Sequence, residues 1–184
     1  MHQSLLKTSL VTSAALVCGF LTLASAQASS VNITETMSRV ELMAGIDQLI
    51  ADEQWEKADR AVTLALKKMP ESAQLRFKRA VIAERAGHTQ KAIRLLKQMI
   101  DRYPEIVEPY NNLAAIYAAQ GQKTKARECL ITAVRINPNF AHGWENLGNL
   151  IVQEALPYYE KAAKAAPDQP RFQTKLRRAQ ALAH

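Results

Sequence analysis

The chain has 184 residues and a net charge of +7, and this length suits one domain or one short array of repeats. Hydrophobic residues at 48% and charged residues at 22% are ordinary globular values, which excludes a largely disordered chain. Aromatic residues reach only 6% while strong helix formers dominate the rest, so the composition predicts an all-α protein and argues against an aromatic-rich β-sandwich.

The N-terminal segment has the pattern of a signal peptide. Lys7 supplies a positive flank, an apolar stretch follows over residues 10–23, and Ala24-Ser25-Ala26 offers the small-x-small pattern of a cleavage site. The apolar stretch is shorter than the roughly 20 residues of a membrane span. The sequence therefore predicts a signal peptide over 1–26, cleaved after Ala26, and a flexible leader over 27–38. An uncleaved anchor is the alternative.

Cysteine and histidine give no sign of a disulfide, a metal site or a cofactor. Once the signal peptide with Cys18 is removed, Cys129 is alone and no intramolecular disulfide can form. A lone Cys on an apolar helix face is most often a small core residue, and a reactive thiol or a bridge between two copies is the alternative. The four histidines lie far apart, with no Cys or carboxylate at the spacing of metal ligands.

A 34-residue period organises the chain after the leader. Three sets of residues recur at this interval. The prolines are Pro70, Pro104 and Pro138, the alanines are Ala58, Ala92 and Ala126, and the glycines are Gly87 and Gly121. Each unit holds two predicted helices of roughly 12–14 residues joined by a short turn. The glycine ends the first helix in a left-handed conformation, and the proline ends the second because it cannot continue the hydrogen-bond ladder.

The period and its residue classes resemble the tetratricopeptide repeat, whose pattern is W-x2-L-G-x2-Y…A-x3-F…P. The best copy is 107–140, and 39–72 and 73–106 are degenerate copies. The matching residues of the best copy are Tyr110, Leu113, Ala114, Tyr117, Gly121, Ala126, Leu130, Ala133 and Pro138. Arg76 departs from the pattern because a bulky apolar residue is usual there, so we expect Leu75 or Phe77 to cover that site. The resemblance implies a right-handed α-solenoid of about four helix pairs.

The fourth unit, 141–167, is shorter than the others. Trp144, Leu147 and Gly148 open it, but Pro167 follows Pro138 by only 29 residues. The missing residues fall after Glu154, which predicts a turn there and a truncated second helix over about 157–166, because Pro157 would break a continuous helix. A capping helix over about 170–182, within the segment 168–184, closes the array, with Phe172, Leu176 and Ala179 on one stripe.

The resemblance implies a concave groove, lined by the first helix of each unit, that binds an extended peptide or a partner helix. Asn112 and Asn146 occupy the same place in consecutive first helices, where some tetratricopeptide proteins carry an asparagine ladder. A carboxamide can both donate to and accept from a peptide backbone. The alternative is that both are ordinary solvated residues. The predicted groove residues are Asn111, Asn112, Glu145, Asn146 and Asn149.

Positive charge concentrates in the second unit, 73–106, which has eight Lys and Arg against three acidic residues. This surface would suit an acidic partner or peripheral contact with an anionic membrane surface, and a solvated convex face is the alternative. Nucleic acid is disfavoured because the chain lacks interleaved aromatic residues for base stacking. The predicted basic patch comprises Lys78, Arg79, Arg85, Lys91 and Arg94.

No catalytic motif appears in the sequence, which has no G-x-S-x-G, no H-E-x-x-H and no glycine-rich phosphate loop. We therefore predict a non-enzymatic scaffold or adaptor for another protein, exported to a bacterial periplasm. The alternative is a structural subunit of a fixed envelope complex, such as secretion, pilus or cell-wall machinery. We expect the chain to be a monomer or to self-associate weakly. The identity of the partner and the pathway do not follow from the sequence.

Overall fold

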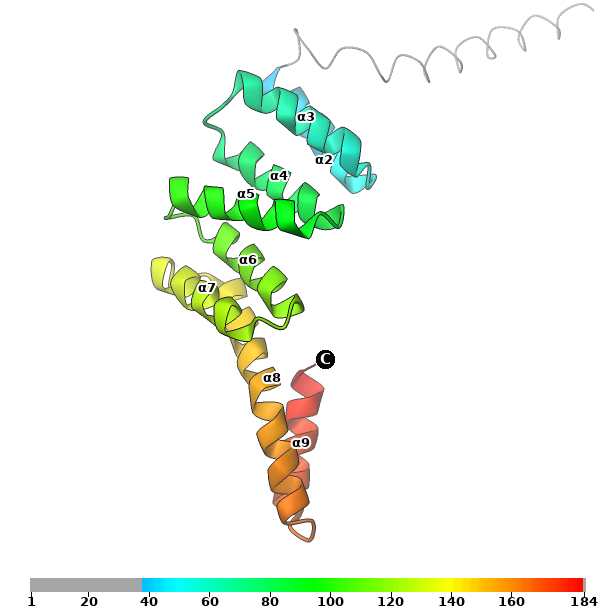
Figure 1. Cartoon of the computed structure of the whole chain (residues 1–184), viewed down its shortest axis with the longest axis vertical. Helices are drawn as coiled ribbons and strands as arrows, with labels where there is room; N and C mark the ends of the chain where they lie inside the picture. The colour runs from blue at the N-terminus through cyan, green and yellow to red at the C-terminus, as the bar shows by residue number, and fades with distance from the viewer. Residues whose placement is uncertain (1–37, 184) are drawn as a thin grey trace, which may run out of the picture. The chain divides into compact units, whose positions relative to one another are not determined.

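A computed structural model describes residues 38–183, and within this part every regular element is a helix (Figure 1). This confirms the predicted all-α fold. The helices are α2 (Arg39–Ala51), α3 (Trp55–Lys68), α4 (Ala73–Arg85), α5 (Thr89–Arg102), α6 (Glu108–Ala119), α7 (Lys123–Ile136), α8 (Ala141–Ala165) and α9 (Pro170–Leu182). The predicted signal peptide, and the leader except for Ser38, lie outside the described residues.

The chain divides into two compact units, Met1–Ala44 and Gly45–His184. The described part of the first unit begins with a capping box at the start of α2. The backbone N–H of Ser38 donates to the Glu41 carboxylate at 2.8 Å, and the Glu41 N–H donates to Ser38 Oγ at 3.3 Å. These reciprocal bonds satisfy backbone donors that a helix start leaves unpaired, and they lower the pKa of Glu41.

Within Gly45–His184 each helix from α3 to α9 packs against the next one along the chain. α4 pairs with α5 and α6 pairs with α7, and successive pairs stack through α3–α4, α5–α6 and α7–α8. Alanine and leucine at the 34-residue period fill the space between helices. The buried periodic residues are Ala80 and Ala114, Ala92 and Ala126, and Leu96 and Leu130. Contact restricted to neighbouring pairs is the arrangement of a solenoid.

The turn between the two helices of a pair has the same backbone conformation in three successive 34-residue repeats. Gly87 (φ 77°) and Gly121 (φ 72°) are left-handed, which confirms their predicted role, and Glu53 (φ 54°) takes this conformation one period earlier. In the second of these turns the His88 N–H donates to the Ala83 carbonyl at 2.8 Å, and the Gly87 N–H donates to the Glu84 carbonyl at 2.9 Å. This is the Schellman pattern that ends a helix, and the other two turns repeat it.

Gly121→Val should lower the free energy of unfolding by about 1–2 kcal/mol, because a β-branched residue is strained at a left-handed φ even though the space around Gly121 is open. Gly45→Ala is the matched control. It lies inside α2 with open space around it, so it should raise the free energy by about 0.5–1 kcal/mol. Urea unfolding of both variants measures the difference, and equal stability of Gly121→Val and wild type would contradict the role of this turn.

A second recurring contact joins consecutive units. At each junction a side chain donates a hydrogen bond to the carbonyl of the proline six residues earlier. The three bonds run from Arg76 to Pro70 (2.6 Å), from Tyr110 to Pro104 (3.1 Å) and from Trp144 to Pro138 (2.9 Å). Arg76 therefore keeps the donor of the aromatic residues that it replaces. Of the two residues expected to cover this site, Leu75 is fully buried and Phe77 is half-buried.

The fourth unit differs from the prediction. The expected turn after Glu154 and the separate helix from Pro157 are wrong, because α8 runs without a break for 25 residues and carries Pro157 inside it. Ala155 stands 34 residues after Gly121, so the position that turns the chain elsewhere has lost its glycine. Pro157 removes one backbone bond and crowds the Gln153 carbonyl. Packing of α7 and α9 against α8 compensates for this cost.

α9 spans the residues expected for the capping helix and packs against α8. Of its predicted apolar stripe, Ala179 is buried, whereas Phe172 and Leu176 are half-buried.

Candidate protein-binding surface

The predicted groove residues lie on two sides of α6 and of the first part of α8. Asn111 is opposite the buried Leu113 in α6, and Glu145 and Asn149 are opposite the buried Leu147 in α8. Asn112 and Asn146 lie nearer the core, one turn before the buried Ile116 and Leu150. Asn111, Asn112 and Asn146 are half-buried, while Glu145 and Asn149 are exposed. α6 and α8 are in direct contact, which brings residues of this set from the two helices together.

The structure links Asn146 to Asn111, one residue before the predicted rung at Asn112. Nδ2 of Asn146 donates to Oδ1 of Asn111 at 2.8 Å. The bond uses one of four hydrogen-bonding positions on each carboxamide, so donors on Asn111 and an acceptor on Asn146 remain for a ligand. The Asn112 side chain makes no hydrogen bond within residues 38–183, so its whole carboxamide is available.

At the corresponding places of the earlier first helices stand Lys78 and Ala44. Lys78, one period before Asn112, forms an ion pair with Asp47 and so ties α4 to α2. Polar contacts thus link consecutive first helices in two places, by an ion pair between α2 and α4 and by paired carboxamides between α6 and α8.

Three of the five residues of the predicted basic patch form ion pairs. Arg79 Nε and Lys91 Nζ both donate to the carboxylate of Asp59, at 3.2 and 2.7 Å. Partial burial by itself would raise the pKa of Asp59, but the hydrogen bonds from these two cations and their positive charges outweigh it and lower that pKa. Since Lys78 is paired with Asp47, only Arg85 and Arg94 of the five form no salt bridge in the described chain.

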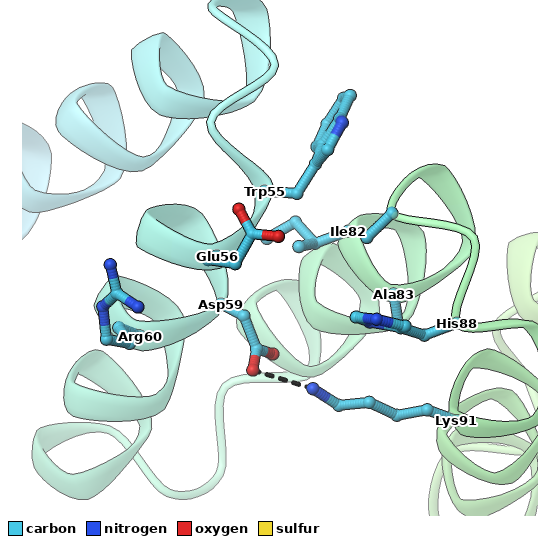
Figure 2. A pocket seen from close by; sticks show the side chains of 9 residues that line it. Trp55, Glu56, Asp59, Arg60, Ile82, Ala83, His88 and Lys91 are labelled. Atoms are coloured by element: carbon cyan, nitrogen blue, oxygen red, sulfur yellow. Dashed lines mark hydrogen bonds and ion pairs between the residues drawn. The ribbon is translucent and has the colours of Figure 1, made fainter.

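Asp59 and Lys91 meet in a hollow between α3, α4 and the start of α5. Figure 2 shows the two side chains pointing toward each other, whereas Arg60 points away from them. Trp55, Ile82 and His88 line the same hollow. Both Asp59 oxygens are held by cations from α4 and α5, so this arrangement braces three helices.

Cys129 lies half-buried against the core, which agrees with its predicted role. Burial raises the pKa of its thiol, so the reactive thiolate is disfavoured. Among residues 38–183, no three side chains of His, Cys, Asp or Glu gather where they could hold a metal ion. In the same range no helix has the length and apolar character to span a membrane.

Sequence reasoning missed a row of exposed apolar side chains on α8. Trp144, Ile151 and Tyr158 are all exposed, and Ile151 and Tyr158 line a hollow together with Lys123 and Arg127 of α7. Arg127 forms an ion pair with Glu154 beside this hollow. The sequence feature that could have indicated this row is the 29-residue interval between Pro138 and Pro167, which is five residues shorter than the period of the other repeats.

Family models described as tetratricopeptide repeat match residues 45–106 and 83–149, so together they cover more than half of the chain. The chain contains tetratricopeptide repeats. This agrees with the turns and proline contacts above, which recur at the 34-residue period of that family. The matched region ends at 149, inside α8, where the helix continues past the position of the family's turn.

Several known proteins are similar to this chain in sequence or in structure. Human general transcription factor 3C polypeptide 3 is 28% identical over 113 residues, which are 59% of this chain but only 12% of that protein. A thermophilic TPR protein from Thermus thermophilus superposes with a TM-score of 0.56 at 21% identity, covering 77% of this chain and 81% of the other. A chain of the Naa15/Naa10 complex bound to HypK-THB gives a TM-score of 0.53 at 19% identity, covering 78% of this chain and 22% of that one. The structural matches show the fold alone.

Proposed function

We propose that this chain is a non-enzymatic scaffold that binds an extended peptide or a partner helix on the polar face of α6 and the first part of α8. The observation that carries the proposal is the cluster of carboxamides across two helices, with Asn146 bonded to Asn111 and with Asn112 beside them. Carboxamides recognise the backbone of a ligand independently of its side chains. The Naa15/Naa10 complex bound to HypK-THB is a fold-level precedent for protein binding.

We also propose that the protein is exported and works in a bacterial cell envelope. The support is the sequence of residues 1–26, with Lys7, an apolar stretch and the small residues Ala24 and Ala26. An N-terminal sequencing experiment on the protein from its native cells tests this, because cleavage would leave Gln27 as the first residue.

The binding face is tested by affinity capture from native cells with wild type and with Asn112→Ala/Asn146→Ala. The double variant should fold normally, because neither side chain is fully buried, but it should recover the partner at least about tenfold less, which is the effect of losing roughly 1.4 kcal/mol of binding.

The matched control is Gln90→Ala/Gln98→Ala, which removes two exposed carboxamides from α5, a second helix of a pair. It should recover the partner as well as wild type does. Equal recovery by wild type and the Asn112→Ala/Asn146→Ala variant would remove the binding face from α6 and α8.

A further inference from the structure

One side of α8 carries large apolar side chains that the described chain leaves more than half exposed. Trp144, Ile151 and Tyr158 are 51%, 51% and 72% exposed, and they are seven residues apart, so they lie on the same side of the helix. Small residues at helical spacing fill the gaps between them. We call this set the α8 stripe, and it consists of Trp144, Gly148, Ile151, Ala155, Tyr158 and Ala162. It holds no charged residue and runs almost the whole length of α8.

In the preceding pairs the equivalent positions are covered by the second helix of the pair. The residues one and two periods before Ile151 are Tyr117 and Ala83, which are 8% and 1% exposed beneath α7 and α5. Ala114, one period before Gly148, is likewise buried, whereas a Cβ at Gly148 would meet nothing within 4 Å. The first half of α8 therefore has a vacant site for a second helix.

The residues of that missing second helix are present, but the chain cannot fold them back. Counted from the closing proline, Ala155 and Ala162 correspond to Ala126 and Ala133, the residues of α7 that are buried in the third pair. Because the turn is missing, this segment continues the line of α8. It can reach an equivalent vacant site only on another molecule, which is the situation that favours exchange of an element between identical chains.

The α8 stripe is also complementary to itself when reversed. Around its midpoint at residue 153, positions 144 and 162 are equally distant, as are 148 and 158, and 151 and 155. Each of these pairs joins one large and one small residue, in the combinations Trp144 with Ala162, Tyr158 with Gly148, and Ile151 with Ala155. A two-fold axis beside residue 153 would place every large side chain against a small one, which is the condition for close interdigitated packing.

We propose that two copies of this chain associate through their α8 stripes, with the two α8 helices antiparallel. Residues 155–162 of each copy then occupy the site that a second helix fills in the earlier pairs. Asn146 and Asn149 lie on the opposite side of α8 from the stripe, so self-association leaves the proposed binding face open. The inference does not depend on the proposed function.

The oligomeric state of the full chain tests the proposal by sedimentation velocity over a concentration series. We expect wild type to be a dimer. Ile151→Glu should weaken dimerisation at least about tenfold, because it places two like charges near the two-fold axis in an apolar contact. Gln153→Glu adds the same charge on the opposite, exposed side of α8 and should dimerise as wild type does. Circular dichroism checks folding, and Tyr158→Glu, at a more exposed position, replaces Ile151→Glu if that variant does not fold.

The orientation is tested with single cysteines in a background where Cys18 and Cys129 are replaced by serine. Gly148→Cys and Tyr158→Cys should form a disulfide between copies only when the two variants are mixed. In an antiparallel pair, residue 148 of one copy lies about 15 Å along the axis from residue 148 of the other copy, and the same holds for residue 158. This separation is beyond the roughly 7 Å reach of a disulfide. A monomeric wild type, a dimer insensitive to Ile151→Glu, or disulfides within each variant alone would overturn the proposal.

Discussion

Insertion of Gly-Gln-Lys-Thr-Lys between Glu154 and Ala155 is expected to split α8 into two antiparallel helices. The insert copies residues 121–125, the turn of the third pair, and restores the 34-residue interval between Pro138 and Pro167. It supplies a glycine at the position where Gly121 is left-handed, so the chain can reverse there. The second half of α8 would then cover Gly148 and Ile151 of its own chain, as α7 covers α6. The variant should therefore be a monomer.

A distance between spin labels at positions 141 and 165, both exposed, measures the change. In a continuous helix the labels are about 36 Å apart, at 1.5 Å per residue. In a folded helix pair they come within about 10 Å, the usual separation of packed helices. An excess of unlabelled chain restricts the measurement to pairs of labels within one molecule.

Insertion of five alanines at the same point is the matched control. Alanine favours the helix, so α8 should lengthen and the labels should move apart to about 44 Å. If the glycine-containing insert also lengthened the distance, the missing turn would not be the reason that α8 is continuous.

The turns and pairings of the fold could be predicted because they depend on local chemistry that repeats. Gly87 and Gly121 specify left-handed turns, and three periodic prolines mark the ends of second helices. Glu53 escaped prediction because a glutamate has no preference for a left-handed φ, although the same backbone hydrogen bonds close its turn. The helix-breaking tendency of Pro157 misled because contacts with α7 and α9 outweigh a local preference.

The candidate site could be predicted only to the level of a helix face. Periodicity places Asn111, Asn112 and Asn146 on one side of α6 and α8, but it does not determine which two side chains meet. Whether Asn146 bonds Asn111 or the neighbouring Asn112 depends on side-chain rotamers and on the separation of the two helices, and the periodicity of the sequence contains neither. The basic patch shows the same limit, because Asp59 lies 20 and 32 residues from the two cations that it pairs with.

Leu96→Ala is expected to lower the free energy of unfolding by about 3 kcal/mol, within the 2–5 kcal/mol of buried leucine truncations. Leu96 is only 1% exposed and belongs to the core cluster that joins α4 to α8. The loss combines the transfer free energy of the removed methyl groups with the cavity that remains, since neighbouring helices in contact on both sides of α5 limit its collapse. Urea unfolding measures the change.

Leu64→Ala is the control, because Leu64 is 38% exposed on α3 and alanine favours the helix, so its cost should stay below about 1 kcal/mol. The two variants should also differ in cooperativity. In a solenoid each pair is stabilised only by its neighbours, so a defect in α5 weakens the coupling between the helices before and after it. The unfolding transition of Leu96→Ala should therefore broaden as well as shift, whereas that of Leu64→Ala should keep its slope. A sharp transition at unchanged urea concentration for Leu96→Ala would mean that α5 does not carry the central packing of the array.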